Sequence, residues 1–138
     1  MKERKFDLED RLIDFVLHAD GIVEKLPNTK LGNYIAGQMI RSCASPALNY
    51  GEAMGAESTN DFIHKLKIIL KELRETFVCL KIIKRKPLIE PSDELEFAYK
   101  ENNELIAIFV KSIQTAKKNK NGKNENHKNT NHHLSPAS

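Results

Sequence analysis

The sequence predicts an all-α protein, an up-down-up-down antiparallel four-helix bundle followed by a disordered C-terminal tail. Four segments carry apolar residues three and four positions apart, which is the spacing of one helix face. Short turns separate these segments, and short connections favour antiparallel neighbours. Aromatic residues make up only 7% of the chain, whereas Leu, Ile, Lys and Glu are plentiful, a composition that favours helices over sheets.

The length of 138 residues suits one domain. We divide it into a bundle of residues 1–116 and a tail of residues 117–138. No apolar run approaches the ~20 residues that cross a bilayer, and no apolar signal-peptide core follows the charged N-terminus. Cys43 and Cys79 both fall in apolar helix patterns, so we expect buried thiols in a reducing cytoplasm, without a membrane partner.

The first two helices are expected at about 7–25 and 30–55. Asp7 is a plausible N-cap of the first, and Gly21 inside it indicates a close contact. Leu26-Pro27 ends it, because the residue before proline is disfavoured in a helix. The second contains Pro46, which should bend it, and is crowded with small residues that let helix backbones approach closely. We predict that these small residues form the central seam of the bundle: Ser42, Cys43, Ala44, Ser45, Ala47, Gly51, Ala53, Gly55 and Ala56.

The third and fourth helices are expected at about 59–86 and 92–116. Ser58 or Thr59 can cap the third, which ends before Pro87. Acidic residues after Pro91 favour the start of the fourth. From residue 117 onward the chain is almost entirely Lys, Asn, His, Gly and Ser, too polar to bury the surface that would offset ordering, so we predict a disordered tail.

Charge is divided unequally between bundle and tail. The net charge is +3. The tail holds five Lys and one Glu, which leaves 17 basic and 18 acidic residues in 1–116. A nucleic-acid-binding surface on the bundle must therefore come from local clustering or from assembly.

A set of residues at fixed spacing suggests a family. It comprises Leu26-Pro27, the run Gln38-x-x-Arg41-Ser42-x-x-Ser45-x-x-x-Asn49-Tyr50-x-Glu52-Ala53-x-x-Ala56-Glu57-Ser58, and Asp61-Phe62-Ile63-x-Lys65-Leu66. This pattern, over about residues 8–113, resembles a four-helix bundle family whose founding members are encoded in intervening sequences of bacterial 23S rRNA genes. The resemblance implies a bacterial-type protein that assembles as a homopentamer and associates with nucleic acid. One relative, which serves diversity-generating retroelements, forms a basic pentameric barrel and works with a reverse transcriptase.

Two groups of residues are candidate sites. The first is a polar ladder of Arg41, Ser42, Ser45, Asn49 and Glu52, either a binding surface or a set of hydrogen bonds that fixes helix register. The second is the cluster Lys81, Lys84, Arg85 and Lys86. Five such ends around a ring could meet RNA phosphates, or the cluster could serve helix capping and solubility. Farther up the same helix, acidic residues interleave with basic ones, which indicates a solvated face of mixed charge: Glu72 and Glu75 lie among Lys65, Lys67, Lys71 and Arg74.

No pattern of a catalytic, cofactor or metal site is present. Glu52 and Glu57, five residues apart, lie on different helix faces, and His18 and His64 are isolated. The tail histidines His127, His132 and His133 lack the ordered four-ligand set of a zinc site. We therefore expect no catalytic residue, no cofactor and no metal. The first hypothesis is a non-catalytic, self-associating scaffold or accessory protein that assists another protein or an RNA; the second is a nucleic-acid-binding accessory factor that uses the basic cluster and the tail.

Overall fold

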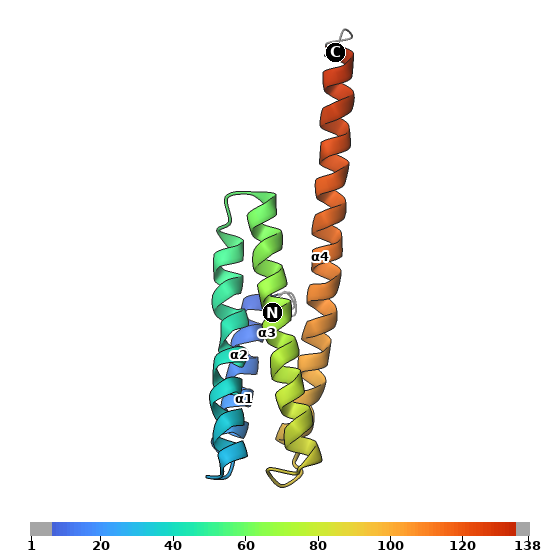
Figure 1. Ribbon diagram of the computed structural model, residues 1–138. Coiled ribbons are helices and arrows are strands. Elements are labelled where there is room, and N and C mark those ends of the chain that lie inside the picture. Colours follow the sequence, from blue (N-terminus) through green and yellow to red (C-terminus); the bar gives the residue numbers. More distant parts are fainter. Residues whose placement is uncertain (1–6, 135–138) are drawn as a thin grey trace.

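Four helices make up the part of the chain that the structure describes. The structure, a computed structural model, describes residues 7–134, with side chains described for residues 7–122. Helix α1 spans Leu8–Val23, α2 Lys30–Met54, α3 Thr59–Arg85 and α4 Asp93–Leu134. The α1–α2 and α3–α4 connections lie at one end and the α2–α3 connection at the other, so neighbouring helices are antiparallel (Figure 1). The predicted four-helix all-α bundle is confirmed.

Each of the four helices begins with the same kind of N-capping hydrogen bond. The side chain of the residue before the first turn accepts a hydrogen bond from a backbone N–H three residues on, as capping residues do. Asp7 accepts from Asp10, Thr29 from Gly32, and Ser58 from Asp61, all at 3.0–3.1 Å. Ser92 caps α4 in the same way, by accepting from the Leu95 N–H at 3.1 Å. The predicted starts near residues 7, 30, 59 and 92 follow from these caps.

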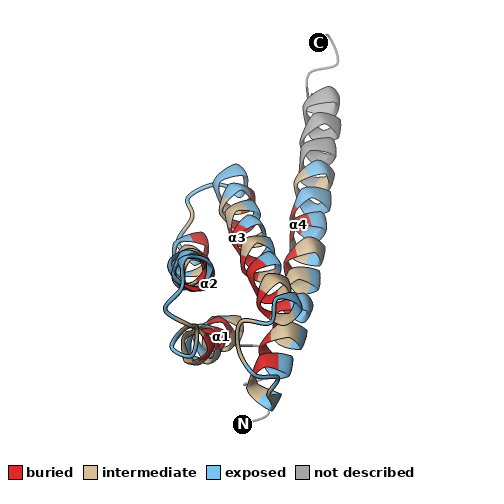
Figure 2. Ribbon diagram, turned by 60° about the horizontal axis from the view of Figure 1, so that its bottom comes forward, coloured by how far each residue is buried: buried red, intermediate tan, exposed pale blue. Residues whose placement is uncertain are grey.

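The core lies along the bundle axis, where the buried faces of the helices meet (Figure 2). Each helix packs against its two neighbours, in the cyclic order α1–α2–α3–α4. An ion pair reinforces α1 against α4, because Arg11 contacts both Glu101, at 2.6 and 2.8 Å, and Glu104, at 2.7 Å. The largest fully buried side chains include Phe15, Ile22, Ile35, Met39, Leu66, Leu73, Leu80, Leu105 and Phe109.

Only a third of the predicted small-residue seam is buried. Of its nine residues, Ser42, Cys43 and Ala53 are buried, and the apolar Ile40 and Leu48 of the same helix are 41% and 70% exposed. Gly51 faces open space, since a Cβ there would meet nothing within 4 Å. Apolar residues occupy both sides of α2, so periodicity alone does not decide which side turns inward. Gly21 does mark a close contact, with Glu94.

The structure differs from the sequence prediction at the end of α4. A disordered tail was expected from residue 117, but the backbone continues as helix to Leu134 and extends past the rest of the bundle (Figure 1). No proline interrupts α4, and adding residues to an established helix is much easier than nucleating one. Ala116 is the last buried residue among those whose side chains are described, so packing ends where the sequence placed the boundary. Residues 135–138 of the predicted tail lie outside the described residues.

Candidate functional site

The polar ladder of α2 separates into three independent contacts. Arg41, at its start, reaches across to α3. Its guanidinium lies 3.2 Å from a Glu72 carboxylate oxygen and 2.9 Å from one of Glu75, and it donates to the side-chain oxygen of Gln38 at 2.7 Å. The hydrogen bond to Glu75 is the largest cause that raises the pKa of Arg41. Arg41 therefore neutralises two carboxylates of the neighbouring helix.

Ser42 forms the second contact, inside the core. Its hydroxyl lies 2.7 Å from that of Thr76, and both residues are fully buried. Thr76 donates its own proton to the Glu72 backbone carbonyl at 3.2 Å. Ser42 is then the donor to Thr76, because a hydroxyl has only one proton to give. This pair fixes the position of α2 relative to α3 along the helix axes.

The remaining ladder residues form the third group, near the end of α2. Asn49 donates to the Ser45 backbone carbonyl at 3.0 Å and to its hydroxyl at 2.9 Å, one turn below. Glu52 is exposed and pairs with Lys65 of α3 at 2.5 Å, which raises the pKa of Lys65. The ladder's side chains contact each other or α3 rather than converge on a common ligand space. Their arrangement fits the register-fixing role better than a binding surface.

The predicted basic cluster lies at the end of α3, and half of it is engaged. The Lys81 ammonium sits 4.8 Å from the Phe77 ring centre. Lys84 lies 4.0 Å from the Tyr99 ring centre and 3.1 Å from a Glu96 carboxylate oxygen. Cation–π contacts of this kind hold an ammonium group against the protein surface.

The other half of the cluster is open to solvent. Arg85 and Lys86 are exposed, and neither forms an ion pair within residues 7–122. Among the described residues, these two cations of the cluster are thus available to a ligand.

Sequence inspection missed a second basic surface, the outer face of α3, which we define as Lys67, Lys71, Arg74 and Val78. The interleaved glutamates Glu72 and Glu75 suggested a face of mixed charge, but they turn toward α2 and pair with Arg41. The three cations have no ion-pair partner among the described side chains. Together with Leu70, Val78 and Glu75 they border a shallow, mainly apolar depression. Plotting α3 at 100° per residue separates the two charge signs and could have found this face.

Asn102 was also missed. It is fully buried and donates to the Leu73 backbone carbonyl across the α3–α4 contact at 3.1 Å. Its side-chain oxygen has no hydrogen-bond partner among the side chains and backbone that the structure describes. A buried amide between helices fixes their relative position at a cost in stability.

Both cysteines are buried, and one of the two helix histidines lies against an aromatic ring. Burial raises the pKa of the Cys43 thiol to about 11, and it raises that of Cys79 as well. Such thiols are poor nucleophiles, because the thiolate is the reactive form. His18 stacks on Phe97, with ring centres 4.5 Å apart. Within residues 7–122, no three His, Cys, Asp or Glu side chains gather closely enough to hold a metal ion.

The described helices were also compared with the requirements for a membrane span. None of the described helices combines the length and the hydropathy needed to span a bilayer.

Comparisons with known proteins agree with this architecture. A solved structure from Bacteroides thetaiotaomicron, described as a protein of unknown function from the S23 ribosomal protein family, superposes with a TM-score of 0.68 at 28% sequence identity. The match covers 76% of this chain and 96% of that one. No functionally curated protein matches the sequence. A family model described as 23S rRNA-intervening sequence protein matches residues 4–111, and the chain therefore belongs to the 23S rRNA-intervening sequence protein family.

Proposed function

We propose that the protein is a non-catalytic, self-associating helical scaffold or accessory protein that assists another protein or an RNA. The observation that carries this proposal is the outer face of α2, which we define as Gly37, Ile40, Ala44, Leu48 and Gly51. Four of these residues are exposed and Ala44 is partly so. An outward helix face of this kind is normally polar.

Charge is scarce on α2. Of its 25 residues only Lys30, Arg41 and Glu52 are charged, and the last two are paired with α3. The glycine and alanine at positions 37, 44 and 51 repeat every seven residues, so they form a stripe along which another helix backbone can approach closely. The partner that fits such a stripe is a second copy of α2, since a helix with this face can bury the same face of its twin.

Five copies is the number we propose, in line with the family resemblance. Cytoplasm is the compartment we propose, and the free, buried thiols of Cys43 and Cys79 support it.

The test is the mass of the assembled protein in solution. Sedimentation velocity of the full chain at micromolar concentration should give a multiple of the 15.7 kDa chain mass. The double variant Ile40→Glu, Leu48→Glu should shift to the single-chain mass with its helical circular dichroism intact, because charges on the outer face cannot be desolvated cheaply. Val78→Glu, an equally exposed position on α3, is the matched control and should leave the assembly unchanged.

The outcome that would sink the assembly proposal is equally direct. A single-chain mass for the unaltered protein across this concentration range would mean that the outer face of α2 is not used for self-association.

A second candidate function is that of a nucleic-acid-binding accessory factor. The outer face of α3 favours it, because Lys67, Lys71 and Arg74 form a positive patch, bordered by a Glu75 that is paired with Arg41, on a body that is slightly acidic as a whole. Arg85 and Lys86, at the other end of α3, add positive charge that is not paired among the described side chains. Binding to phosphates releases counterions, so affinity for single-stranded RNA should fall with salt by a logarithmic slope of about −0.7 per phosphate contacted.

Fluorescence anisotropy with single-stranded RNA tests this second candidate. Lys71→Gln with Arg74→Gln should weaken binding and reduce the salt slope by about 1. Binding by the unaltered chain that vanishes entirely at physiological salt would remove the candidate.

A further inference from the structure

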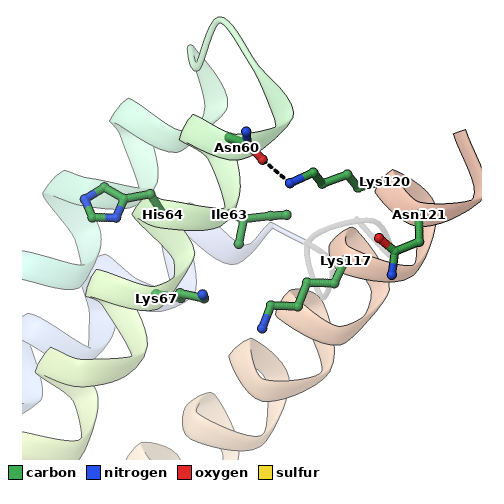
Figure 3. Close-up of a pocket in the computed structure, with 7 residues that line it drawn as sticks. All are labelled: Asn60, Ile63, His64, Lys67, Lys117, Lys120 and Asn121. Carbon is green, nitrogen blue, oxygen red and sulfur yellow. Dashed lines mark hydrogen bonds between the residues drawn. The ribbon is translucent and has the colours of Figure 1, made fainter. Parts of the chain in front are cut away.

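A cleft separates α3 from α4 at the end of the bundle where the α2–α3 turn lies (Figure 3). Its volume is about 380 Å³. Asn60, Ile63 and Lys67 line it from α3, and Lys117, Lys120 and Asn121 line it from α4. Ile63, which is buried, forms an apolar wall between the two helices. Without the continuation of α4 past Ala116, one side of this cleft would not exist.

The cleft is positively charged. Three of its lining side chains are lysines, and no carboxylate lines it. Lys120 donates to the neutral side-chain oxygen of Asn60, so its charge is held in place without being cancelled. Lys67 and Lys117 point toward each other across the opening (Figure 3) and have no ion-pair partner among the described side chains. Three ammonium groups kept this close together favour an anion between them.

The first turn of α3 adds to the same potential. Asn60 belongs to this turn, and the positive end of the helix dipole lies there. The side-chain amides of Asn60 and Asn121 supply neutral hydrogen-bonding groups at the rim. His64 contributes little, because its imidazole turns away from α4 (Figure 3). The set of donors therefore consists of compact ammonium and amide groups from two helices.

We propose that this cleft binds a phosphate group carried by a nucleotide or by a nucleic acid. Lysine is a common phosphate ligand and acts as a point charge. The volume exceeds that of a phosphate alone and falls in the range of small-ligand sites. Lys67 also belongs to the outer face of α3, so a strand whose phosphate occupies the cleft can continue along that face. The proposal thus deepens the second candidate function by giving one phosphate a defined position.

The test compares two double variants of the full chain that carry the same change in net charge. Lys117→Gln with Lys120→Gln removes cleft lysines. Lys111→Gln with Lys118→Gln removes exposed lysines of the same helix that do not line the cleft. Each is titrated with single-stranded RNA that carries either a 5′-phosphate or a 5′-hydroxyl, and with inorganic pyrophosphate.

The cleft variant should bind the RNA about tenfold more weakly at physiological salt, with a salt slope reduced by about 1, whereas the control variant should stay within about twofold of the unaltered chain. Tighter binding of the 5′-phosphorylated RNA, lost in the cleft variant alone, would identify a terminal phosphate as the ligand. A loss in the cleft variant that is the same for both RNAs would identify the phosphodiester backbone.

Two results would overturn the proposal. Equal weakening by the two double variants would mean that general charge, and not the cleft, attracts the RNA; the second candidate function would still stand. If the unaltered chain binds no RNA at physiological salt, the second candidate function fails, and the pyrophosphate titration alone tests the cleft. Equal affinity of the unaltered chain and both double variants for pyrophosphate would then exclude the cleft as a phosphate site.

Discussion

Gly32 illustrates at the scale of one residue how the turn between α1 and α2 limits the sequence. A Cβ at this position would lie 2.1 Å from the backbone oxygen of Pro27 and 3.0 Å from the Thr29 hydroxyl. Backbone atoms cannot yield without moving the turn. We predict that Gly32→Ala lowers the free energy of unfolding by about 3 kcal/mol, as overpacking does, measured by urea denaturation.

Gly21→Ala is the matched comparison. Its Cβ would approach only the carboxylate end of Glu94, at 2.6 Å, which can swing away at the expense of an exposed ion pair with Lys25. The helical preference of alanine offsets that loss, so the change should stay within about 0.5 kcal/mol. Equal destabilisation by the two variants would contradict the contacts described at Gly32.

Cys43 gives the protein a predictable response to alkali. Burial, followed by the charge of Asp20, raises the pKa of its thiol from the ordinary 9.0 to about 11. A group whose pKa is raised in the folded state contributes stability below its unfolded pKa and loses it as the pH rises toward the folded pKa. The contribution of this thiol, about 2–3 kcal/mol, should therefore be complete below pH 9 and decline between pH 9 and 11.

The variant Cys43→Ala isolates the contribution of this thiol to the free energy of unfolding. Urea denaturation at pH 8, 9.5 and 10.5 should give a stability difference between the unaltered chain and the variant that shrinks as the pH rises. Cys79 and Tyr50 titrate in both proteins and so cancel in the difference. A difference that stays constant across this range would mean that the Cys43 thiol is not shielded as described.

The contact between α2 and α3 depends on one buried hydroxyl pair. Thr76→Val leaves the Ser42 proton without its acceptor across the helices, at a cost of about 1–3 kcal/mol, whereas Ser42→Ala leaves Thr76 still bonded to the Glu72 carbonyl and should cost about 1 kcal/mol. The double variant should cost less than the sum of the two. Equal and additive costs in a double-mutant cycle would show that the two hydroxyls are not coupled.

Much of each element could be predicted from local sequence. Capping residues, prolines and apolar spacing act within one or two turns, so the starts of all four helices and the buried stripes of α1, α3 and α4 were accessible. Which side of α2 turns inward was not, because apolar residues occupy both sides of this helix. The pairing of Ser42 with Thr76, 34 residues apart, and the burial of Asn102 depend on tertiary contacts that no local pattern encodes.

The candidate sites were predicted less well than the fold, for the same physical reason. Charges adjacent in sequence point in different directions on a helix, so Glu72 and Glu75 concealed the positive outer face of α3. The cleft between α3 and α4 could not be predicted from the sequence, because one of its sides comes from residues that were expected to be disordered.

At the scale of the whole molecule, the buried core ends well before the last helix does. The buried core ends at Ala116, while α4 continues to Leu134. We predict that residues 1–116 alone unfold within about 3 °C of the full chain, because residues 117–122, the removed positions whose side chains are described, include no core residue. A chain ending at residue 108, which lacks the fully buried Phe109, should melt far lower, and circular dichroism during heating distinguishes the two. A large loss on truncation at 116 would mean that the later part of α4 packs against the bundle.

Arg41 has an effect beyond the helix that carries it. By pairing with Glu72 and Glu75 it keeps two negative charges from the surface of α3, yet it belongs to α2. A single exchange at position 41 for a neutral residue would leave both carboxylates without this partner, and Glu75, whose side chain is 40% exposed, lies beside the cations of the outer face of α3. The electrostatic potential on α3 thus depends on a residue of a neighbouring helix: a change at position 41 can weaken the positive potential of the outer face of α3 while every residue of α3 stays the same.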